Sequence, residues 1–313
     1  AGGSVASGPR GYSFEAAPKY LAFLDEALER ASPGAARLLE KEGFSMVDLA
    51  YNRGISGGLY AISILIALFN NQITFSIVII VFSILALIEF QRLINYKSYF
   101  AITLLLLLVY NFYRSHIDYS SIVYLLTANF ASHFFLFYKL VKSKKIKYKY
   151  ITKSILSTLY LALGCFFIIA LAGTGENYNP MEVLLFFILV WVNNSFAYLI
   201  GKKIGKRPLF ESISPKKTWE GFLGGLIFTI IAAFIIYYYK ADFLLNFYLI
   251  YAILITVLAT LGDLIQSKFK RHANVKDSGS LIPGHGGFFD RMDSVIFSAP
   301  WIYFFVKFNQ YVS

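Results

Sequence analysis

The chain has 313 residues, of which 57% are hydrophobic and 18% aromatic, while 15% are charged. Soluble globular domains contain about 25% charged residues, and a chain of this size could not bury so many apolar helices on every side. The composition therefore excludes an ordinary soluble protein and predicts an all-α, polytopic membrane protein. The net charge of +11 does not indicate nucleic-acid binding, because the basic residues cluster between apolar segments, where they contact lipid head groups and anionic substrates.

Residues 1–45 differ in composition from the rest of the chain. They are rich in Ala, Gly, Arg and Glu, whereas the later residues are rich in Ile, Phe, Tyr, Asn and Lys. The segment is predicted to form soluble helices and contains no apolar run of the signal-peptide type. We interpret it as a fusion-derived segment, with a natural cytosolic extension as the alternative. The membrane-embedded domain is predicted to occupy residues 46–313.

Nine apolar windows follow, and each is predicted to be a membrane helix. They lie at about 55–69, 73–91, 100–113, 120–138, 154–173, 181–200, 221–239, 244–265 and 293–311. Twenty lysines and arginines fall on one side of these windows, and three, Arg114, Lys240 and Lys307, fall on the other. The positive-inside rule makes the basic side cytoplasmic and puts the N-terminus on that side. Glu89, near the end of the second window, is predicted to pair with Arg92 on the next helical turn.

The stretch 261–294 carries the densest group of polar residues. Asp263 ends the eighth window on the cytoplasmic side, and Asp290 and Asp293 open the ninth on one face of a helix. Carboxylates brought together repel one another unless a cation joins them, and an oxygen-only ligand set suits Mg²⁺. We therefore predict that Asp263, Asp290 and Asp293 bind Mg²⁺.

A glycine loop at 283–287 separates these carboxylates. Glycines let a backbone approach a phosphate closely and turn its N–H groups inward. The basic residues before the loop would neutralise a polyphosphate. Asp277 is equally suited to capping its own loop, and an isolated histidine such as His285 is more often structural than a base. The predicted substrate contacts in this stretch are Ser267, Lys270, Arg271, Lys276, Asp277, Gly284, His285, Gly286, Gly287 and Arg291.

This stretch resembles the signature of the phosphatidate cytidylyltransferase (CDP-diacylglycerol synthase) family. The resemblance is carried by the blocks Ser267–Arg271, Lys276–Gly279 and Pro283–Asp293, and two more blocks, Ser214–Gly221 and Asn193–Tyr198, are similar to further family elements. The chain departs from the family pattern at Asn194 and Gln266, where the family has Asp and Glu. Both departures remove a carboxylate and keep an oxygen acceptor, so they affect how many cations bind.

The resemblance implies that the chain transfers CMP from CTP to phosphatidate, releasing pyrophosphate and forming CDP-diacylglycerol for phospholipid biosynthesis. It implies a catalytic part at about 190–294, one or two bound cations including Mg²⁺, and a homodimer. It also implies a bacterial inner-membrane enzyme whose active site faces the cytoplasm. Lys217, Lys270 and Arg271 would neutralise phosphates. The remaining implied substrate contacts are Asn194, Ser214, Lys216 and Ser267.

Two other function classes are compatible with a basic, polytopic membrane chain. A CTP-dependent polyprenol or lipid kinase would transfer the γ-phosphate and release CDP. A non-enzymatic transporter would place its ionisable residues near the middle of the membrane, whereas the carboxylates here gather at one end of the windows. A synthase that acts on ether phospholipids is a close variant that the motifs do not separate from a phosphatidate enzyme.

Overall fold

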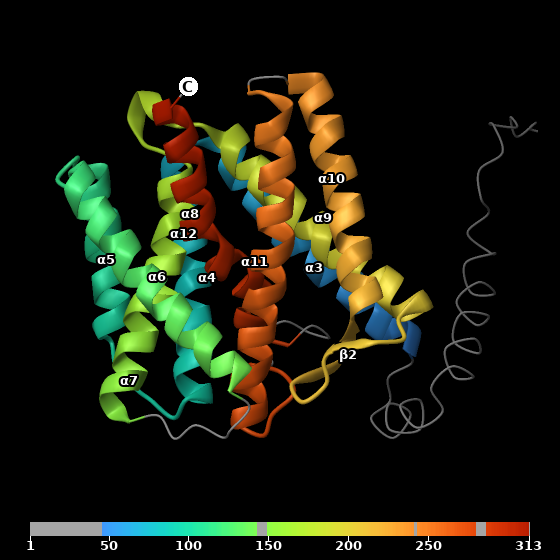
Figure 1. Cartoon of the computed structure of the whole chain (residues 1–313). Helices are drawn as coiled ribbons and strands as arrows, with labels where there is room; N and C mark the ends of the chain where they lie inside the picture. Colours follow the sequence, from blue (N-terminus) through green and yellow to red (C-terminus); the bar gives the residue numbers. More distant parts are fainter. Residues whose placement is uncertain (1–45, 143–148, 241–242, 280–285, 313) are drawn as a thin grey trace, which may run out of the picture. The chain divides into compact units, whose positions relative to one another are not determined.

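The computed structural model describes residues 46–142, 149–240, 243–279 and 286–312, with side chains from residue 57 onward. The segment 1–45, and with it the fusion-segment interpretation, lies outside the described residues, as do Gly284 and His285. Within these ranges the chain is mostly α-helical and contains one two-stranded hairpin (Figure 1). Residues 60–282 and 286–313 belong to one compact unit, and the packing described below lies within it.

The elements follow one another in the order of the apolar windows. They are α3 (Met46–Asn70), α4 (Gln72–Leu93), α5 (Phe100–Tyr113), α6 (Tyr119–Val141), α7 (Tyr150–Ile155), η2 (Leu156–Ala162), α8 (Leu163–Leu171), η3 (Gly175–Asn177), α9 (Pro180–Ile204), β1 (Pro208–Phe210), β2 (Ser214–Thr218), α10 (Trp219–Lys240), α11 (Leu245–His272) and α12 (Phe289–Val312).

Several helices begin where the local sequence offers a cap. Asn71, Asp118 and Asn179 precede α4, α6 and α9, and each side chain accepts a hydrogen bond of 2.9–3.2 Å from a backbone N–H in the first turn. These contacts satisfy donors that have no partner inside the helix. Pro180 occupies the first turn of α9, where a missing N–H costs nothing. The helix starts are therefore determined largely by adjacent residues.

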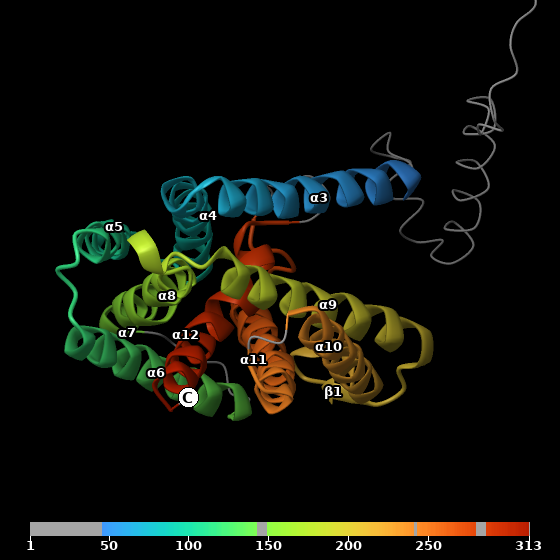
Figure 2. The ribbon, with the colours of Figure 1, turned by 90° about the horizontal axis from the view of Figure 1, so that it is seen from above.

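The segment from Tyr150 to Leu171 is the core of the N-terminal part. It runs as α7, the π-helical turn η2 and α8, and every residue from Tyr160 to Ala172 is buried. It packs against α4, α5, α6 and α12, and α8 lies between α5 and α12 (Figure 2). A helix that is apolar on all sides is stable when other helices surround it. Residues 160–172 of the window 154–173 are thus enclosed by protein.

The C-terminal helices pack side by side, with α11 between α10 and α12 and with α9 against α10 (Figures 1 and 2). Glycines make the close approach of α9 and α10 possible. A Cβ atom at Gly221 would lie 2.6 Å from the Ala197 carbonyl oxygen, and one at Gly224 would lie 2.7 Å from Ile200 side-chain atoms. Small residues at such a seam let helix backbones approach closely, as in other membrane helix pairs.

Six helical segments among the described residues are long and apolar enough to cross a membrane. They are Gln72–Leu93, Tyr119–Val141, Tyr150–Leu171, Gly175–Ile204, Trp219–Lys240 and Leu245–His272, and two shorter apolar helices span Gly57–Asn70 and Phe100–Tyr113. Leu223, Ile227 and Ile231 form an exposed apolar stripe along one face of α10, as expected for a lipid-facing helix. The predicted helical, polytopic membrane architecture is confirmed to this extent.

Candidate active site

Three sequence blocks that are far apart in the chain line one cavity of about 680 Å³. The first block comes from the second half of α9, the second is the hairpin strand β2, and the third is the part of α11 around Asp263. The polar lining residues are Asn193, Asn194, Tyr198, Lys202, Lys206, Ser214, Lys216, Lys217, Thr218, Thr260 and Asp263. The cavity therefore combines cationic, amide and hydroxyl groups with a carboxylate.

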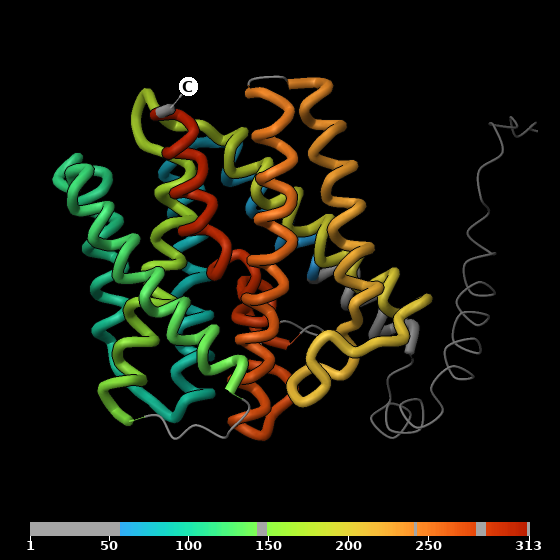
Figure 3. The backbone as a smooth tube through the Cα atoms, in the orientation of Figure 1, coloured from blue at the N-terminus to red at the C-terminus, as the bar shows by residue number. Residues whose placement is uncertain are grey.

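The hairpin lies at the lysine-rich end of the helices. Its strands are antiparallel, with Pro208 opposite Thr218, and Figure 3 shows it beside the C-terminal part of α11. Glu220 accepts hydrogen bonds of 3.0 and 3.2 Å from the backbone N–H groups of Lys206 and Arg207, which closes the base of the hairpin. Arg271 of α11 donates to the Ile213 carbonyl at 3.4 Å. These contacts fix where β2 presents its lysines.

Lys217 of β2 forms an ion pair with Asp263 of α11. Their side chains are 25% and 35% exposed, so the pair lies at the cavity surface where a ligand can reach it. Ser267, one turn after Asp263, has its hydroxyl 3.4 Å from the same carboxylate. Because a cation and a carboxylate face one cavity together, the site can contact both a phosphate and a metal ion.

Asp293 of α12 lies next to Asp263 across the α11–α12 contact. At Gly262 the two helices approach so closely that a Cβ atom would lie 2.7 Å from the Asp293 carbonyl oxygen. Asp293 is buried, and Asp263 is close enough for the two carboxylates to repel each other. Ser294 follows and accepts a hydrogen bond of 3.2 Å from the Asn194 amide, which connects α12 to α9. Two carboxylates and an asparagine pair thus converge from three helices.

Asp290 has a different environment from the other two carboxylates. Its Oδ1 accepts from Lys270 Nζ at 2.7 Å and from Gln266 Nε2 at 2.8 Å. Its Oδ2 accepts from the backbone N–H and hydroxyl of Ser278 at 2.7 and 2.8 Å, and from the Gly287 N–H at 3.0 Å. Burial opposes the charged form, but Lys270 and these donors outweigh it and hold the pKa of Asp290 below its ordinary value.

The predicted Mg²⁺ trio is not assembled in this structure. Among the described residues, no group of three or more His, Cys, Asp and Glu side chains is arranged to hold a metal ion. Asp290 accepts hydrogen bonds from several donors on both oxygens, whereas Asp263 contacts Lys217 and, at 3.4 Å, the Ser267 hydroxyl. Asp263 and Asp293 are carboxylates of the type that Mg²⁺ takes together with phosphate oxygens. Asn193 Oδ1 is buried without a hydrogen-bond partner and belongs to a residue that lines the same cavity. Carboxylate and amide oxygens are compatible in type with Mg²⁺.

A sequence profile of the cytidylyltransferase family matches residues 51–309, which is most of the chain. The chain belongs to this family. The predicted family resemblance is therefore confirmed. Residues Asp263, Asp290 and Asp293 all lie inside the matched range, as do the hairpin and both asparagines.

Relatives of this cytidylyltransferase carry the name phosphatidate cytidylyltransferase. The protein from Staphylococcus haemolyticus is 34% identical over 225 residues, which cover 69% of this chain and 85% of the relative. The protein from Bacillus subtilis is 32% identical over 268 residues, covering 83% and 98%. The protein from Haemophilus influenzae is 42% identical over 142 residues, covering 42% and 49%. The similarity to the Bacillus protein extends over nearly all of that relative.

The other predicted residues of this family member differ in where they lie. Ser214, Lys216, Lys217 and Asn194 line the cavity, while Lys270 is directed to Asp290. Arg271, Lys276 and Asp277 are exposed, and Arg291 is partly buried on the first turn of α12. Gly286 has a positive φ of 84°, and a Cβ there would lie 2.7 Å from Asp290 Oδ2. Glycine is therefore required at this position by conformation and by space.

The predicted pairing of Glu89 with Arg92 is wrong. Glu89 is fully buried and accepts hydrogen bonds from the Ser278 hydroxyl and from the N–H groups of Phe288 and Phe289. Sequence spacing favoured the local pair, but α4 turns the carboxylate toward the segment between α11 and α12, residues 273–288, which we call the signature loop. A carboxylate inside an apolar helix is costly, and this alone could have marked Glu89 as a site residue.

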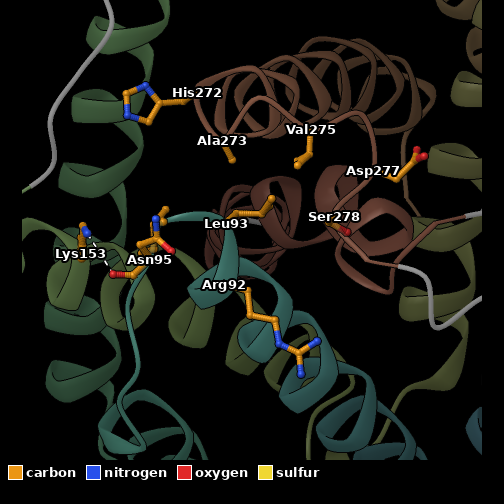
Figure 4. A pocket seen from close by; sticks show the side chains of 10 residues that line it. Arg92, Leu93, Asn95, Lys153, His272, Ala273, Val275, Asp277 and Ser278 are labelled. Atoms are coloured by element: carbon orange, nitrogen blue, oxygen red, sulfur yellow. Dashed lines mark hydrogen bonds between the residues drawn. The ribbon is translucent and has the colours of Figure 1, made fainter.

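Arg92 instead lines a second cavity of about 610 Å³ (Figure 4). The ends of α4, α7 and α11 form it, and Lys153 donates to the Asn95 carbonyl at 3.0 Å on one wall. Asp277 and Ser278 line the other side, where the close-up shows Asp277 turned away from Arg92. The second cavity is thus lined by residues of the signature loop, and one of them, Ser278, hydrogen-bonds to Asp290.

Proposed function

We propose that the chain transfers the cytidylyl group of CTP to phosphatidate, releasing pyrophosphate and forming CDP-diacylglycerol. The single observation that carries this proposal is the convergence of the α9, β2 and α11 blocks on one cavity that holds Lys216, Lys217 and Asp263. The family match and the names of the relatives support the same reaction. Their names describe those relatives, and the cavity is the reason to extend the activity to this chain.

The main barrier to this reaction is the approach of two anions. The phosphate of phosphatidate is already negatively charged at neutral pH, so attack on the α-phosphate of CTP needs little help from a general base. Lys216 and Lys217 lie on β2 at the cavity and would neutralise the triphosphate. Ser214 at the start of the same strand would donate a hydrogen bond. The rigid hairpin base would keep these groups in place during transfer.

Asp263 and Asp293 are the residues that would hold Mg²⁺, with an amide oxygen of the asparagine pair beside them. When bound, Mg²⁺ would supply positive charge to the attacking and leaving phosphate oxygens. Lys217 pairs with Asp263 in this structure, and it would exchange that carboxylate for a phosphate when CTP binds. A second cation stays a prediction that Asn194 makes less favourable, because an amide carries no charge.

Asp290 is proposed to organise the signature loop. Five donor groups lie within hydrogen-bond distance of its two oxygens, from Lys270, Gln266, Ser278 and Gly287. The departure at Gln266 has a physical reason here, because an amide donates to Asp290 whereas a carboxylate would repel it. These bonds would hold Ser278 and Gly287 in place relative to α11.

We propose a nine-span topology with the N-terminus and the active site on the cytoplasmic face of a bacterial inner membrane. The nine predicted windows coincide with α3, α4, α5, α6, the α7–α8 segment, α9, α10, α11 and α12. Twenty basic residues on the hairpin side against three on the other support this orientation.

Single cysteines at Asn177 and Lys276, in a Cys165→Ser background, would react with an impermeant thiol reagent from opposite faces. Labelling from the same face would contradict the proposal. The implied homodimer stays a prediction.

The proposed activity is tested with CTP labelled at either the α- or the γ-phosphate. The purified chain, phosphatidate and Mg²⁺ should move the α-label into lipid and the γ-label into pyrophosphate. A lipid kinase would move the γ-label into lipid and release labelled CDP from the α-labelled substrate. Absence of both products in the intact, folded protein would contradict an enzymatic function and favour the transporter class.

A further inference from the structure

The α4 helix contributes a buried carboxylate to the signature loop, although it lies almost 190 residues earlier in the chain. Glu89 is 0% exposed, and Ser278 Oγ donates to its Oε2 at 3.0 Å. The backbone N–H groups of Phe288 and Phe289 donate to Oε1 and Oε2 at 3.1 and 2.9 Å. Burying a carboxylate is costly, and these donors offset that cost.

The loop is shaped around this carboxylate. A Cβ atom at Gly279 would lie 2.5 Å from Glu89 Oε1, and one at Gly287 would overlap Glu89 Oε2. Both glycines therefore leave the space that the carboxylate occupies. Because the two positions lie before and after the loop tip, Glu89 contacts both ends of the loop. A carboxylate that served only helix α4 would not need complementary glycines on another segment.

Glu89 and Asp290 share the Ser278 hydroxyl. The Ser278 oxygen lies 3.0 Å from Glu89 Oε2 and 2.8 Å from Asp290 Oδ2. A hydroxyl has one hydrogen and donates to one carboxylate at a time, so the serine connects the two groups. Asp290 also accepts from the N–H of Gly287, while Glu89 accepts from the next two N–H groups. Two carboxylates thus divide three consecutive backbone donors at the start of α12.

We propose that Glu89 is a positioning residue that sets the first turn of α12, and through it Asp290 and Asp293, relative to the cavity. The first N–H groups of a helix have no partner inside the helix, and Glu89 supplies one for Phe288 and Phe289. Asp293 lies four residues after Phe289, so a shift of this turn moves the carboxylate that faces Asp263. This inference rests on the proposed cytidylyltransferase activity for its kinetic consequence, but the loop contacts stand independently of it.

The test uses the full chain with Glu89→Gln, which keeps the side-chain volume and replaces one acceptor by a donor facing Phe289 and Ser278. We expect kcat for CDP-diacylglycerol formation to fall about 100-fold, as for a displaced catalytic group, while KM for CTP changes little. Hydrogen exchange at the Phe288 and Phe289 amides should become faster in the same variant. Glu89→Asp keeps the charge and should recover part of kcat.

Glu182→Gln is the matched control, because it removes a partly buried carboxylate from the first turn of α9, away from the loop. It should leave kcat and the exchange of the loop amides unchanged. Ser278→Ala provides a milder second variant if Glu89→Gln does not fold, and it should lower kcat in the same direction. Unchanged kcat in Glu89→Gln or Ser278→Ala would overturn the proposal, as would equal loss of kcat in the Glu182 control. If the unmodified chain makes no CDP-diacylglycerol, the proposed function fails, whereas the amide exchange still decides whether Glu89 holds the loop.

Discussion

The helix Tyr150–Leu171 and the α9–α10 pair are both apolar, but they are packed in different ways. In the first, every residue from Tyr160 onward is buried among large side chains, and the Phe166 ring lies 5.6 Å from that of Phe112. In the second, glycines bring the backbones together and α10 leaves Leu223 and Ile227 exposed. Aromatic packing fills space and stabilises the scaffold. Glycine packing brings the polar end of α9 close to the hairpin and forms the cavity.

This comparison separates stability from activity. The enclosed helix has no side chain that lines the 680 Å³ cavity, whereas α9, β2 and α11 supply its polar lining. Changes in the enclosed helix should therefore affect unfolding more than turnover. Changes at the cavity surface should do the reverse, because side chains such as Lys217 and Asp263 are partly exposed and contribute less to the packed core.

The largest expected effect is on stability in the enclosed helix. Phe166→Ala should lower the free energy of unfolding by about 3–5 kcal/mol, because a fully buried aromatic ring is replaced by a cavity. Turnover per folded molecule at low temperature should change little. Denaturant unfolding in detergent, with activity measured on the folded fraction, checks both values. If Phe166→Ala kept the free energy of unfolding of the unmodified chain but lost turnover, the prediction would be wrong.

A carboxylate at the cavity should show the opposite result. Asp293→Asn keeps the shape and removes the charge beside Asp263, so kcat should fall by about 100- to 1000-fold with little change in thermal stability. Asp118→Asn is the control, since Asn also caps a helix well and this residue precedes α6. Turnover assays with phosphatidate and Mg²⁺ compare the two. Near-normal kcat in Asp293→Asn would remove Asp293 from the metal site.

Substitution of Lys217 in the hairpin should have a smaller effect, which appears in kcat/KM for CTP. Lys217→Met removes a charge that faces the cavity, and kcat/KM for CTP should fall about 10- to 100-fold, as expected for one charged hydrogen bond. Lys203 lies in the last turn of α9, near the hairpin in sequence, but it does not line the cavity. Lys203→Met should therefore leave kcat/KM unchanged, and an equal loss in both variants would indicate a general charge effect.

The smallest expected effect concerns the glycine seam. Gly224→Ala places a Cβ atom 2.7 Å from Ile200 and should cost about 1–3 kcal/mol of stability through overpacking. Turnover should fall severalfold as α9 moves away from α10. Gly58→Ala introduces the same methyl group inside α3, where no heavy atom lies within 4 Å, and it should lower neither property. Parallel melting curves and assays on the two variants measure the difference.

Much of the architecture follows from local sequence. Apolar windows of sufficient length predict helices in a membrane because the backbone must satisfy its own hydrogen bonds there. Caps such as Asn71 and Asn179 act within one helical turn. The signature stretch likewise identifies the family, and the structure places Lys217 and Asp263 at one cavity as the motifs suggest. These features depend on composition or on neighbours along the chain.

Other features depend on which helices become neighbours, and the sequence by itself does not determine them. Glu89 is directed at Ser278 instead of Arg92, because tertiary packing buries it against a loop that lies far along the chain. Asp290, predicted to be a metal ligand, has its oxygens occupied by donors from α11 and the loop. Spacing along a helix shows which side chains share a face, but it does not show what that face contacts. Tertiary structure therefore decided the partners of these carboxylates, while composition and motifs determined the membrane architecture and the family.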